Sequence, residues 1–293
     1  MAKNGRIQKR ILTVIESVLI LIFFFSLSYI LLNLYLDNKS EKTLSDMRNV
    51  VKASRLQQEE IKIPEAAIAK NEEKKAKVEA ELAKKEAEKK AEAEAMTTKK
   101  TNVILDVYKE FHDKNENFNG WLYVEDTELE YPVMKGPDNK FYLSHDIERK
   151  YDKHGMLIMD DGCDETASCP HLIIYGHNVN SGKMFGDLLF YKDASYYKYH
   201  PDISFDTLYE RGSYRVFAVL ATTVNEAQKE IELFTTYSFN NKKDYEKIVK
   251  WAKEHSLYKI DYVPEYGDGI LSLVTCEHSQ DEGRFVVMAA RVK

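Results

Sequence analysis

The chain lacks the excess of positive charge that nucleic-acid-binding proteins carry. It has 42 Lys and Arg residues against 48 Asp and Glu residues, which gives a formal net charge of -6 at pH 7. Proteins that bind nucleic acid neutralise phosphates with a basic face. The composition therefore argues against nucleic acid as a partner, and it restricts the function no further.

The N-terminus lacks the small-residue cleavage site of a secretory signal peptide. It has instead an uncharged apolar run, 17–36, whose length of about 20 residues matches the roughly 30 Å hydrocarbon core of a bilayer. We predict an uncleaved, single-pass transmembrane anchor over this run. Basic residues in the preceding segment, 1–16, place that segment in the cytoplasm and the rest of the chain outside the cell. They are Lys3, Arg6, Lys9 and Arg10.

Residues 37–100 lack the apolar pattern of a coiled coil. From Lys70 to Ala95 almost every residue is Ala, Glu or Lys, and only Val78 and Leu82 approach a and d positions. These residue types favour helix, and many Glu and Lys residues stand three or four positions apart. We therefore expect a charged helical stalk over 37–100, broken at Pro64, that spaces the C-terminal part from the membrane. A helix that binds a partner is the alternative.

The chain has only three cysteines, so at least one is unpaired. Disulfides persist in exported proteins, and Cys163 and Cys169 are close enough in sequence to pair, although two unpaired thiols fit equally well. A zinc site built from these two thiols and His171 lacks a fourth ligand, so we predict no metal. The remaining thiol, Cys276, needs a functional explanation in an exported protein.

From about residue 101 the charged segment gives way to short apolar runs typical of strands. Helices are expected over 102–115, in two short pieces at 184–189 and 194–199, and over 241–257, where Asn241 is the N-cap. The apolar runs are continuous or alternating, which predicts a mainly β domain, 101–293, folded as a closed β-barrel of about eight strands. The runs are 120–124, 129–134, 140–144, 155–160, 171–177, 213–223, 270–276 and 284–292.

The last two runs bring a cysteine and an arginine together. They are joined by a short polar loop, 277–283, and are predicted to form an antiparallel hairpin. Cys276 ends the first run and Arg284 begins the second, so the hairpin makes them neighbours. A guanidinium stabilises a thiolate and donates to developing negative charge. The simpler alternative is a small buried cysteine near an unrelated arginine.

The choice of an acid/base residue among eight histidines is less clear. His177 stands where a buried apolar run meets a loop with Gly and Asn, a place where proteins often present catalytic side chains. His278 lies two residues after Cys276 and could share a face with it on an extended chain. His200 is a third candidate, and the local pattern alone leaves the choice open.

The motifs around these residues resemble those of sortases. Ser272–Cys276 (SLVTC) resembles the family signature TLxTC, with Ser replacing the first Thr, while Tyr175–Asn178 (YGHN) and Gly283–Phe285 (GRF) resemble the histidine and arginine elements in the family's order. The resemblance covers residues 101–293 and is greatest for class B. The class B features are DNKFYL at 138–143, GMLIMD at 155–160, the leading helical residues and the insertion at 241–257.

The resemblance implies a sortase-type barrel, with N-terminal helices and a helical insertion before the nucleophile strand, that acts as a cysteine transpeptidase. Cys276 would attack a backbone carbonyl in a sorting signal of a secreted protein, Arg284 would stabilise the oxyanion, and His177 would protonate the leaving amine. A peptidoglycan-precursor amine would then resolve the thioester, joining the protein to the cell wall without a cofactor. Four flanking residues are expected to contact the substrate: Asn178, Ser272, Thr275 and Glu277.

Two other functions fit the same residues. A cysteine peptidase would resolve the thioester with water, and a non-catalytic surface protein would use the barrel to bind a ligand. For a class B enzyme we expect a sorting signal of the N-P-x-T-N or x-P-x-T-G type. We also expect the insertion 241–257 to form one rim of the active groove and its flanking loops, 222–240 and 258–268, to influence which signal is accepted. The alternative is that the helix only covers an exposed face of the barrel far from the substrate.

Overall fold

The structure is a computed structural model that describes residues 2–68, 103–167, 169–276 and 281–292. The chain divides into two compact units, Met1–Asn49 and Val50–Lys293. The first unit is formed by the helix α1 (Ala2–Ile68), which continues into the second.

Helix α1 contains the predicted membrane span. Its segment Ile15–Gln57 is long and apolar enough to cross a membrane by length and composition, and its large apolar side chains up to Leu36 are exposed. The helix includes Pro64, so the expected break there is wrong. A proline removes a single backbone hydrogen bond, and near the end of a long helix this loss does not prevent one further turn. The predicted helix over Lys70–Ala95 lies outside the described residues.

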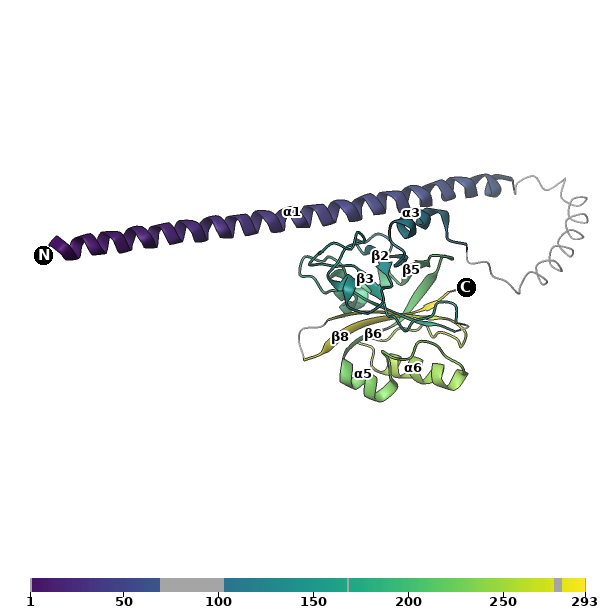
Figure 1. Ribbon diagram of the computed structural model, residues 1–293. Helices are drawn as coiled ribbons and strands as arrows, with labels where there is room; N and C mark the ends of the chain where they lie inside the picture. Colours follow the sequence, from purple (N-terminus) through teal and green to yellow (C-terminus); the bar gives the residue numbers. More distant parts are fainter. Residues whose placement is uncertain (1, 69–102, 168, 277–280, 293) are drawn as a thin grey trace, which may run out of the picture. The chain divides into compact units, whose positions relative to one another are not determined.

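The described residues of the second unit form a closed barrel of eight strands, as predicted (Figure 1). The strand order is β1-β2-β3-β4-β7-β8-β6-β5, in which β2–β3 and β4–β7 are parallel pairs. Closure leaves no unpaired sheet edge. The strands are β1 Phe118–Tyr123, β2 Glu130–Met134, β3 Leu157–Met159, β4 His171–Tyr175, β5 Asp202–Thr207, β6 Ser213–Thr223, β7 Ile270–Cys276 and β8 Gly283–Arg291.

Helices and turns cover the barrel. The strand β6 is packed by α5 (Val224–Ile231) and α6 (Lys242–Glu254), which lie together on one side of the barrel in Figure 1. Strands covered on both faces are expected to read as continuous apolar runs. Every residue of β7 before Cys276 is buried, and β6 and β8 are buried over most of their length. The remaining elements are α3 Asp106–Lys114, α4 Ala194–Tyr199 and the 3-10 helices η2 Phe141–Leu143 and η3 Asp187–Lys192.

The structure confirms most of the predicted elements and corrects a few. The N-cap of α6 is Asn241, whose side chain accepts a hydrogen bond from the Asp244 amide at 3.0 Å. The run 140–144 is not a strand but the turn η2, because the Asp138 carboxylate caps the amides that begin it. Strand β5 and helix α5 were not predicted. Both are too polar to stand out from loops, and α5 falls inside the loop expected over 222–240.

Candidate active site

The pairing of β7 with its two neighbours gathers the candidate residues at one end of the barrel. Strands β4 and β7 run parallel with Tyr175 opposite Val274, so the residues that follow each strand emerge at the same end. Strand β8 is antiparallel to β7 and pairs Arg284 with Cys276. The predicted hairpin neighbours are thus confirmed as neighbours, and His177 follows β4 beside them.

A cavity of about 310 Å³ opens at this end of the barrel. Its volume lies at the lower end of the range for sites that bind small molecules. Much of its lining is apolar, with a few polar groups that could orient a bound peptide. The lining residues are His177, Cys276 and Arg284, together with Asn139, Leu143, Ile158, Tyr175, Gly176, Val274 and Thr275.

The imidazole of His177 is held by a backbone carbonyl. Its Nε2 lies 2.8 Å from the carbonyl oxygen of Leu143, in the turn η2. A carbonyl can only accept, so Nε2 carries the hydrogen of this bond. The His177 carbonyl in turn accepts a hydrogen bond from the Phe185 amide at 2.9 Å, which fixes the loop that follows β4.

Two side-chain hydrogen bonds join the end of β7 to the end of β4. The Asn178 amide group donates to the Cys276 carbonyl at 2.9 Å, and the Thr275 hydroxyl donates to the Gly176 carbonyl at 2.7 Å. Gly176 has no room for a side chain, since an added Cβ would lie 2.5 Å from a Leu157 methyl carbon. Asn178 and Thr275, expected to contact substrate, therefore already have partners that position the cysteine's backbone.

Cys276 and Arg284 are both partly exposed. Cys276 is a free thiol, which leaves its sulfur available for reaction. The Arg284 guanidinium donates from Nη1 to the Gly283 carbonyl at 2.9 Å. On its other side Arg284 pairs with Thr222 of β6, so the arginine is carried by a strand fixed on both edges. A guanidinium held in this way can direct its remaining donors into the cavity.

The other predicted substrate contacts are not at the cavity or are not described. Ser272 is buried, and its hydroxyl lies 2.8 Å from His171 Nε2 rather than in the cavity lining. Glu277 and the rival base His278 lie outside the described residues. The other rival, His200, is not part of the lining, and its Nδ1 contacts the Glu125 carbonyl at 3.1 Å.

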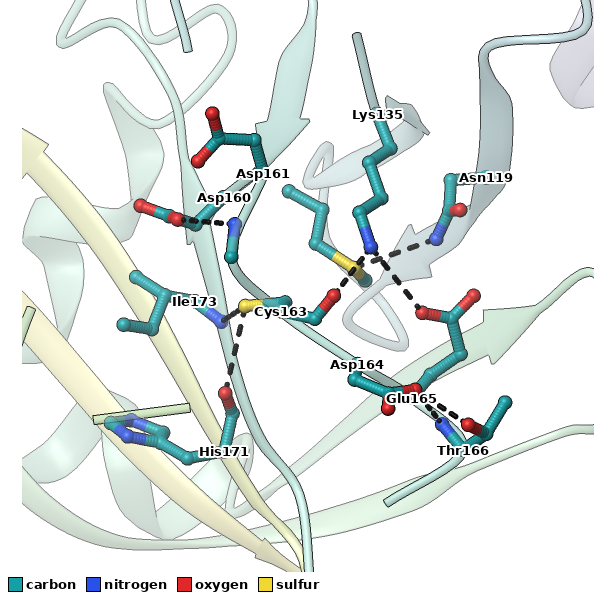
Figure 2. A network of polar contacts seen from close by, with 12 residues as sticks. Asn119, Lys135, Asp160, Asp161, Cys163, Asp164, Glu165, Thr166, His171 and Ile173 are labelled. Carbon is teal, nitrogen blue, oxygen red and sulfur yellow. Dashed lines mark hydrogen bonds and ion pairs between the residues drawn. The ribbon is translucent and has the colours of Figure 1, made fainter. Parts of the chain in front are cut away.

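Cys163 and Cys169 are unpaired in the structure and occupy separate sites. The Cys163 sulfur accepts a hydrogen bond from the Ile173 amide at 3.2 Å and donates to the His171 carbonyl at 3.5 Å, as Figure 2 shows. Burial raises the pKa of the Cys163 thiol to about 12, which keeps it protonated and unreactive. Cys169 contacts the Asp268 carbonyl at 3.7 Å, and burial raises the pKa of its thiol as well.

The imidazole of His171 has two partners that a zinc ion would have to displace. Its Nδ1 lies 2.7 Å from the Thr236 carbonyl, and its Nε2 contacts Ser272. Burial lowers the pKa of His171 to about 4, so the ring is neutral. His171 therefore serves as a buried link between β4, β7 and the chain before α6.

Two structural features at or near the site were not predicted from the motifs. Asn139 and Leu143 line the cavity, although the sequence marked their segment only as a class B feature. Helix α5 begins next to Arg284, where the Asn225 side chain donates to Glu282 at 2.8 Å. For Asn139 and Leu143, the sequence did contain a usable sign, because Asp138 stands where a capping carboxylate begins a turn. For α5, the long polar insertion contained no pattern that predicts a helix.

The expected rim is wrong for one flank of the insertion and stays a prediction for the other. The described cavity lining includes no residue of α5, α6 or their connecting loops. Segment 258–268 precedes Ile270, where β7 begins, whereas Cys276 is at the opposite end of that strand. A loop that feeds the start of the nucleophile's strand therefore cannot border a site at its end. Only the α5 side of the insertion is close to the described site.

Comparisons with known proteins identify the family to which this barrel belongs. A family model of the sortase domain matches residues 122–292. Sortase B of Listeria monocytogenes is 29% identical over 198 residues, which are 67% of this chain and 78% of that protein. Sortase B of Staphylococcus aureus is 32% identical over 181 residues, which are 61% of this chain and 72% of that protein.

The fold of the second unit is found in solved sortase structures. The complex of Staphylococcus aureus sortase B with a substrate superposes with a TM-score of 0.59 at 28% identity, and it covers 73% of this chain and 99% of that one. Since the matched domain, the relatives and the barrel all agree, the chain belongs to the sortase family of cysteine transpeptidases, among its class B members.

Proposed function

We propose that Cys276, His177 and Arg284 are the catalytic residues of this cysteine transpeptidase. One observation carries the proposal: the three side chains line a single cavity at the common end of β4, β7 and β8. The two other thiols among the described residues are buried and contact backbone groups elsewhere. Cys276 is therefore the thiol best placed to act as a nucleophile.

The reaction follows from the chemistry of the three groups. The Cys276 thiolate attacks a backbone carbonyl of the bound peptide, and Arg284 donates to the oxyanion that forms. His177, as imidazolium, gives a proton to the leaving amine when the C–N bond breaks. A second amine then attacks the thioester, passes a proton to His177 and releases Cys276 with a new amide bond formed.

Members of this family anchor proteins to the cell wall, and the substrate proposed here is a sorting signal of the N-P-x-T-N or x-P-x-T-G type. The acceptor in this proposal is an amine of the peptidoglycan precursor. Support comes from the cavity's largely apolar lining and from the solved complex of a related sortase B with its substrate. The backbone amides and polar side chains of an extended peptide would pair with the few polar groups at the cavity mouth.

The proposed location is the cell membrane, with the catalytic domain facing the cell wall. Sortases are cell-surface enzymes, and the apolar part of α1 could serve as the anchor. We propose residues 17–36 as the span, 1–16 as a cytoplasmic tail, 37–100 as a stalk and 101–293 as the catalytic domain. The basic residues before the span support this orientation.

The test compares the full chain with Cys276→Ala in detergent micelles, using a peptide that contains Asn-Pro-Ala-Thr-Asn. We expect the variant to lose turnover while keeping its circular dichroism spectrum, because replacing a partly exposed thiol removes little packing. Turnover by the alanine variant would eliminate Cys276 as nucleophile and redirect attention to Cys163 and Cys169.

Mass analysis of the products separates a transpeptidase from a hydrolase. With a short glycine peptide as the added amine, we expect a product extended by that peptide. A product that carries only a new carboxylate, at every concentration of amine, would indicate hydrolysis instead. A chain that only binds the peptide would give neither product, and a thiol-reactive peptide mimic would leave Cys276 unlabelled.

A further inference from the structure

The 3-10 turn η2 contacts the catalytic histidine through its last residue. The Leu143 carbonyl, which ends the turn, accepts the hydrogen bond from His177 Nε2 at 2.8 Å, and Leu143 also lines the cavity. Among the described residues this is the one hydrogen bond that the imidazole makes. Nδ1 is consequently the ring nitrogen that remains to exchange a proton with substrate.

The start of the turn is fixed by a carboxylate. One oxygen of Asp138 accepts hydrogen bonds from the amides of Lys140 at 2.9 Å and Phe141 at 2.8 Å. These two bonds lower the pKa of the Asp138 carboxyl, so it is ionised at neutral pH and holds both amides. Asp138 itself is exposed to solvent, so its cap orients the turn without contributing to the core.

The centre of the turn is fixed by a buried tyrosine. The Tyr142 hydroxyl accepts a hydrogen bond from the Asn115 side chain at 2.8 Å and donates to the Asn117 side chain at 3.0 Å. The Tyr142 carbonyl accepts from the Met156 amide at 2.7 Å, just before β3. The turn is therefore tied both to the end of α3 and to the approach to β3.

The far side of the Leu143 carbonyl is closed by a glycine. Gly155 has a φ of +57°, and a Cβ added there would lie 2.3 Å from the Leu143 carbonyl oxygen. Neither the backbone conformation nor the space allows a side chain at this position. The carbonyl is held between Gly155 and His177 and has little freedom to move away from the imidazole.

We infer that η2, fixed by Asp138, Tyr142 and Gly155, is the positioning element of His177. Its Leu143 carbonyl keeps the hydrogen of the neutral ring on Nε2 and makes Nδ1 the nitrogen that transfers the proton. This inference rests on the proposed acid/base role of His177. It assigns to a backbone carbonyl the orienting role that a carboxylate plays in the catalytic triads of other enzymes.

The proton transfer balances in this arrangement. Before reaction the pair is a Cys276 thiolate and a His177 imidazolium with hydrogens on both ring nitrogens. The S–C bond forms, the scissile C–N bond breaks, and the Nδ1 proton passes to the leaving nitrogen. The products are a thioester, a neutral amine and a neutral imidazole that still donates from Nε2 to Leu143. The second amine reverses the sequence.

The first test removes the capping carboxylate of the turn and compares the effect with that of removing a similar cap elsewhere in the chain. Asp138→Ala in the full chain, in detergent micelles, is expected to lower kcat on the order of tenfold with KM within about twofold, because misplacing a catalytic group slows chemistry more than binding. The control is Asp193→Ala, which removes a similar cap, the acceptor of the Ser195 amide at 2.8 Å before α4. It is expected to leave both constants unchanged.

The second test reads the position of the hydrogen directly. The full chain is labelled with ¹⁵N-histidine, and the signals of His177 are assigned by their loss in His177→Asn. When the imidazole is neutral, His177 is expected to be the Nε2–H tautomer. In Asp138→Ala and Gly155→Ala the Nδ1–H tautomer is expected to appear. Gly155→Ala should show the larger change, since it displaces the carbonyl itself.

Three results would overturn the inference. One is a wild-type His177 in the Nδ1–H form. Another is a loss of kcat in Asp138→Ala that leaves the tautomer unchanged, which would make the turn merely structural. The third is an equal loss in Asp193→Ala. None of these measurements decides the nucleophile, because the tautomer is observed without turnover. A failure of the proposed function, such as activity in Cys276→Ala, is therefore seen separately.

Discussion

The guanidinium of Arg284 is specified by geometry as well as by charge. It is carried on β8 between β6 and β7, directly opposite Cys276, and one of its nitrogens is already committed to the Gly283 carbonyl. The remaining donors form a planar fork that keeps its direction as the oxyanion develops, whereas a lysine ammonium is a flexible point charge. Direction, more than net charge, is what the site requires of this residue.

We therefore predict that Arg284→Lys loses most activity although the charge is retained. Removal of a directed oxyanion donor typically lowers kcat by about 10²–10³-fold, and the lysine should recover only a small part of this. The measurement is kcat with the peptide substrate, alongside Arg284→Ala as the reference for complete loss. Near-normal turnover of the lysine variant would show that a positive charge alone is sufficient.

A second residue-scale prediction concerns the buried His171. Its pKa is lowered by burial to about 4, below the ordinary 6.5, so between these values the unfolded chain binds a proton that the folded chain does not. The free energy of unfolding should then decrease by roughly 3 kcal/mol as the pH falls from about 6.5 to about 4. Below that range His171 should cause no further decrease.

Denaturant titrations of the wild type and of His171→Gln, across that pH range, would measure this contribution. Glutamine keeps a donor for Thr236 and a partner for Ser272 but does not titrate. The difference between the two stability curves should slope with pH in this window. A flat difference would contradict a neutral, buried His171.

At the residue scale, side chains were predictable where local pairing alone decided their position. Two apolar runs joined by a short loop predict a hairpin in which Cys276 and Arg284 are neighbours, and the structure confirms that they are paired. His177 was one of three candidates until the family motif was considered, because its position depends on the parallel pairing of β4 with a strand far along the chain. The Leu143 carbonyl could not be predicted, since a backbone group has no signature in the sequence.

At the scale of elements, the apolar runs predicted seven of the eight strands among the described residues, and polar composition hid the last one. Strand β5 (DISFDT) alternates serine, aspartate and threonine with apolar residues in a short segment. It pairs with β1 and β6 and so depends on distant partners. Capping, in contrast, acts locally. The Asp138 cap overrode the β-like composition of 140–144 and produced a turn.

The insertion between β6 and β7 yields a prediction at this scale. Its first part, α5, starts where β6 ends beside Arg284, and the Val224 amide donates to the Glu282 carbonyl at 3.1 Å. Its last part, 258–268, leads to the opposite end of β7. We expect exchange of 224–240 with the equivalent segment of a sortase of different preference to shift the choice between competing peptides by roughly tenfold.

Exchange of 258–268 serves as the matched control, because it alters the same insertion at the far end of the strand. Competition between two peptides, followed by mass spectrometry, gives the ratio of kcat/KM directly. An unchanged ratio in a folded, active 224–240 chimera would make the insertion a scaffold only. Equal shifts in both chimeras would mean that the peptide reaches further around the barrel than the cavity.

At the scale of the whole molecule, composition predicts the order of segments, but it gives no sign that part of α1 belongs to the second compact unit. That unit begins at Val50, inside α1, whereas the catalytic domain proposed above begins at residue 101. Within it, Arg55 Nη1 contacts Glu130 at 3.0 Å, and its guanidinium lies 3.5 Å from the centre of the Tyr123 ring. A charged segment has no hydrophobic periodicity from which a contact with a residue 75 positions away could be predicted.

Removal of residues 1 to about 95 should still leave a soluble enzyme that is active on peptides, because all eight described strands and the three proposed catalytic residues lie beyond this point. Its stability should nevertheless be lower than that of a protein beginning at Val50. The Glu130 side chain is 8% exposed and also contacts Trp121 Nε1 at 3.2 Å, so removing Arg55 takes a cation from a largely buried carboxylate.

We expect this to cost about 1–3 kcal/mol, less than for a fully buried pair because Arg55 is partly exposed. Denaturant titrations of the two truncated proteins would measure the difference, and Glu130→Gln in the shorter one should recover part of it by removing the charge. Equal stability of the two proteins would mean that Arg55 contributes nothing to the second unit. A shorter protein that is folded but inactive on peptides would show that the segment before residue 96 takes part in recognition or catalysis.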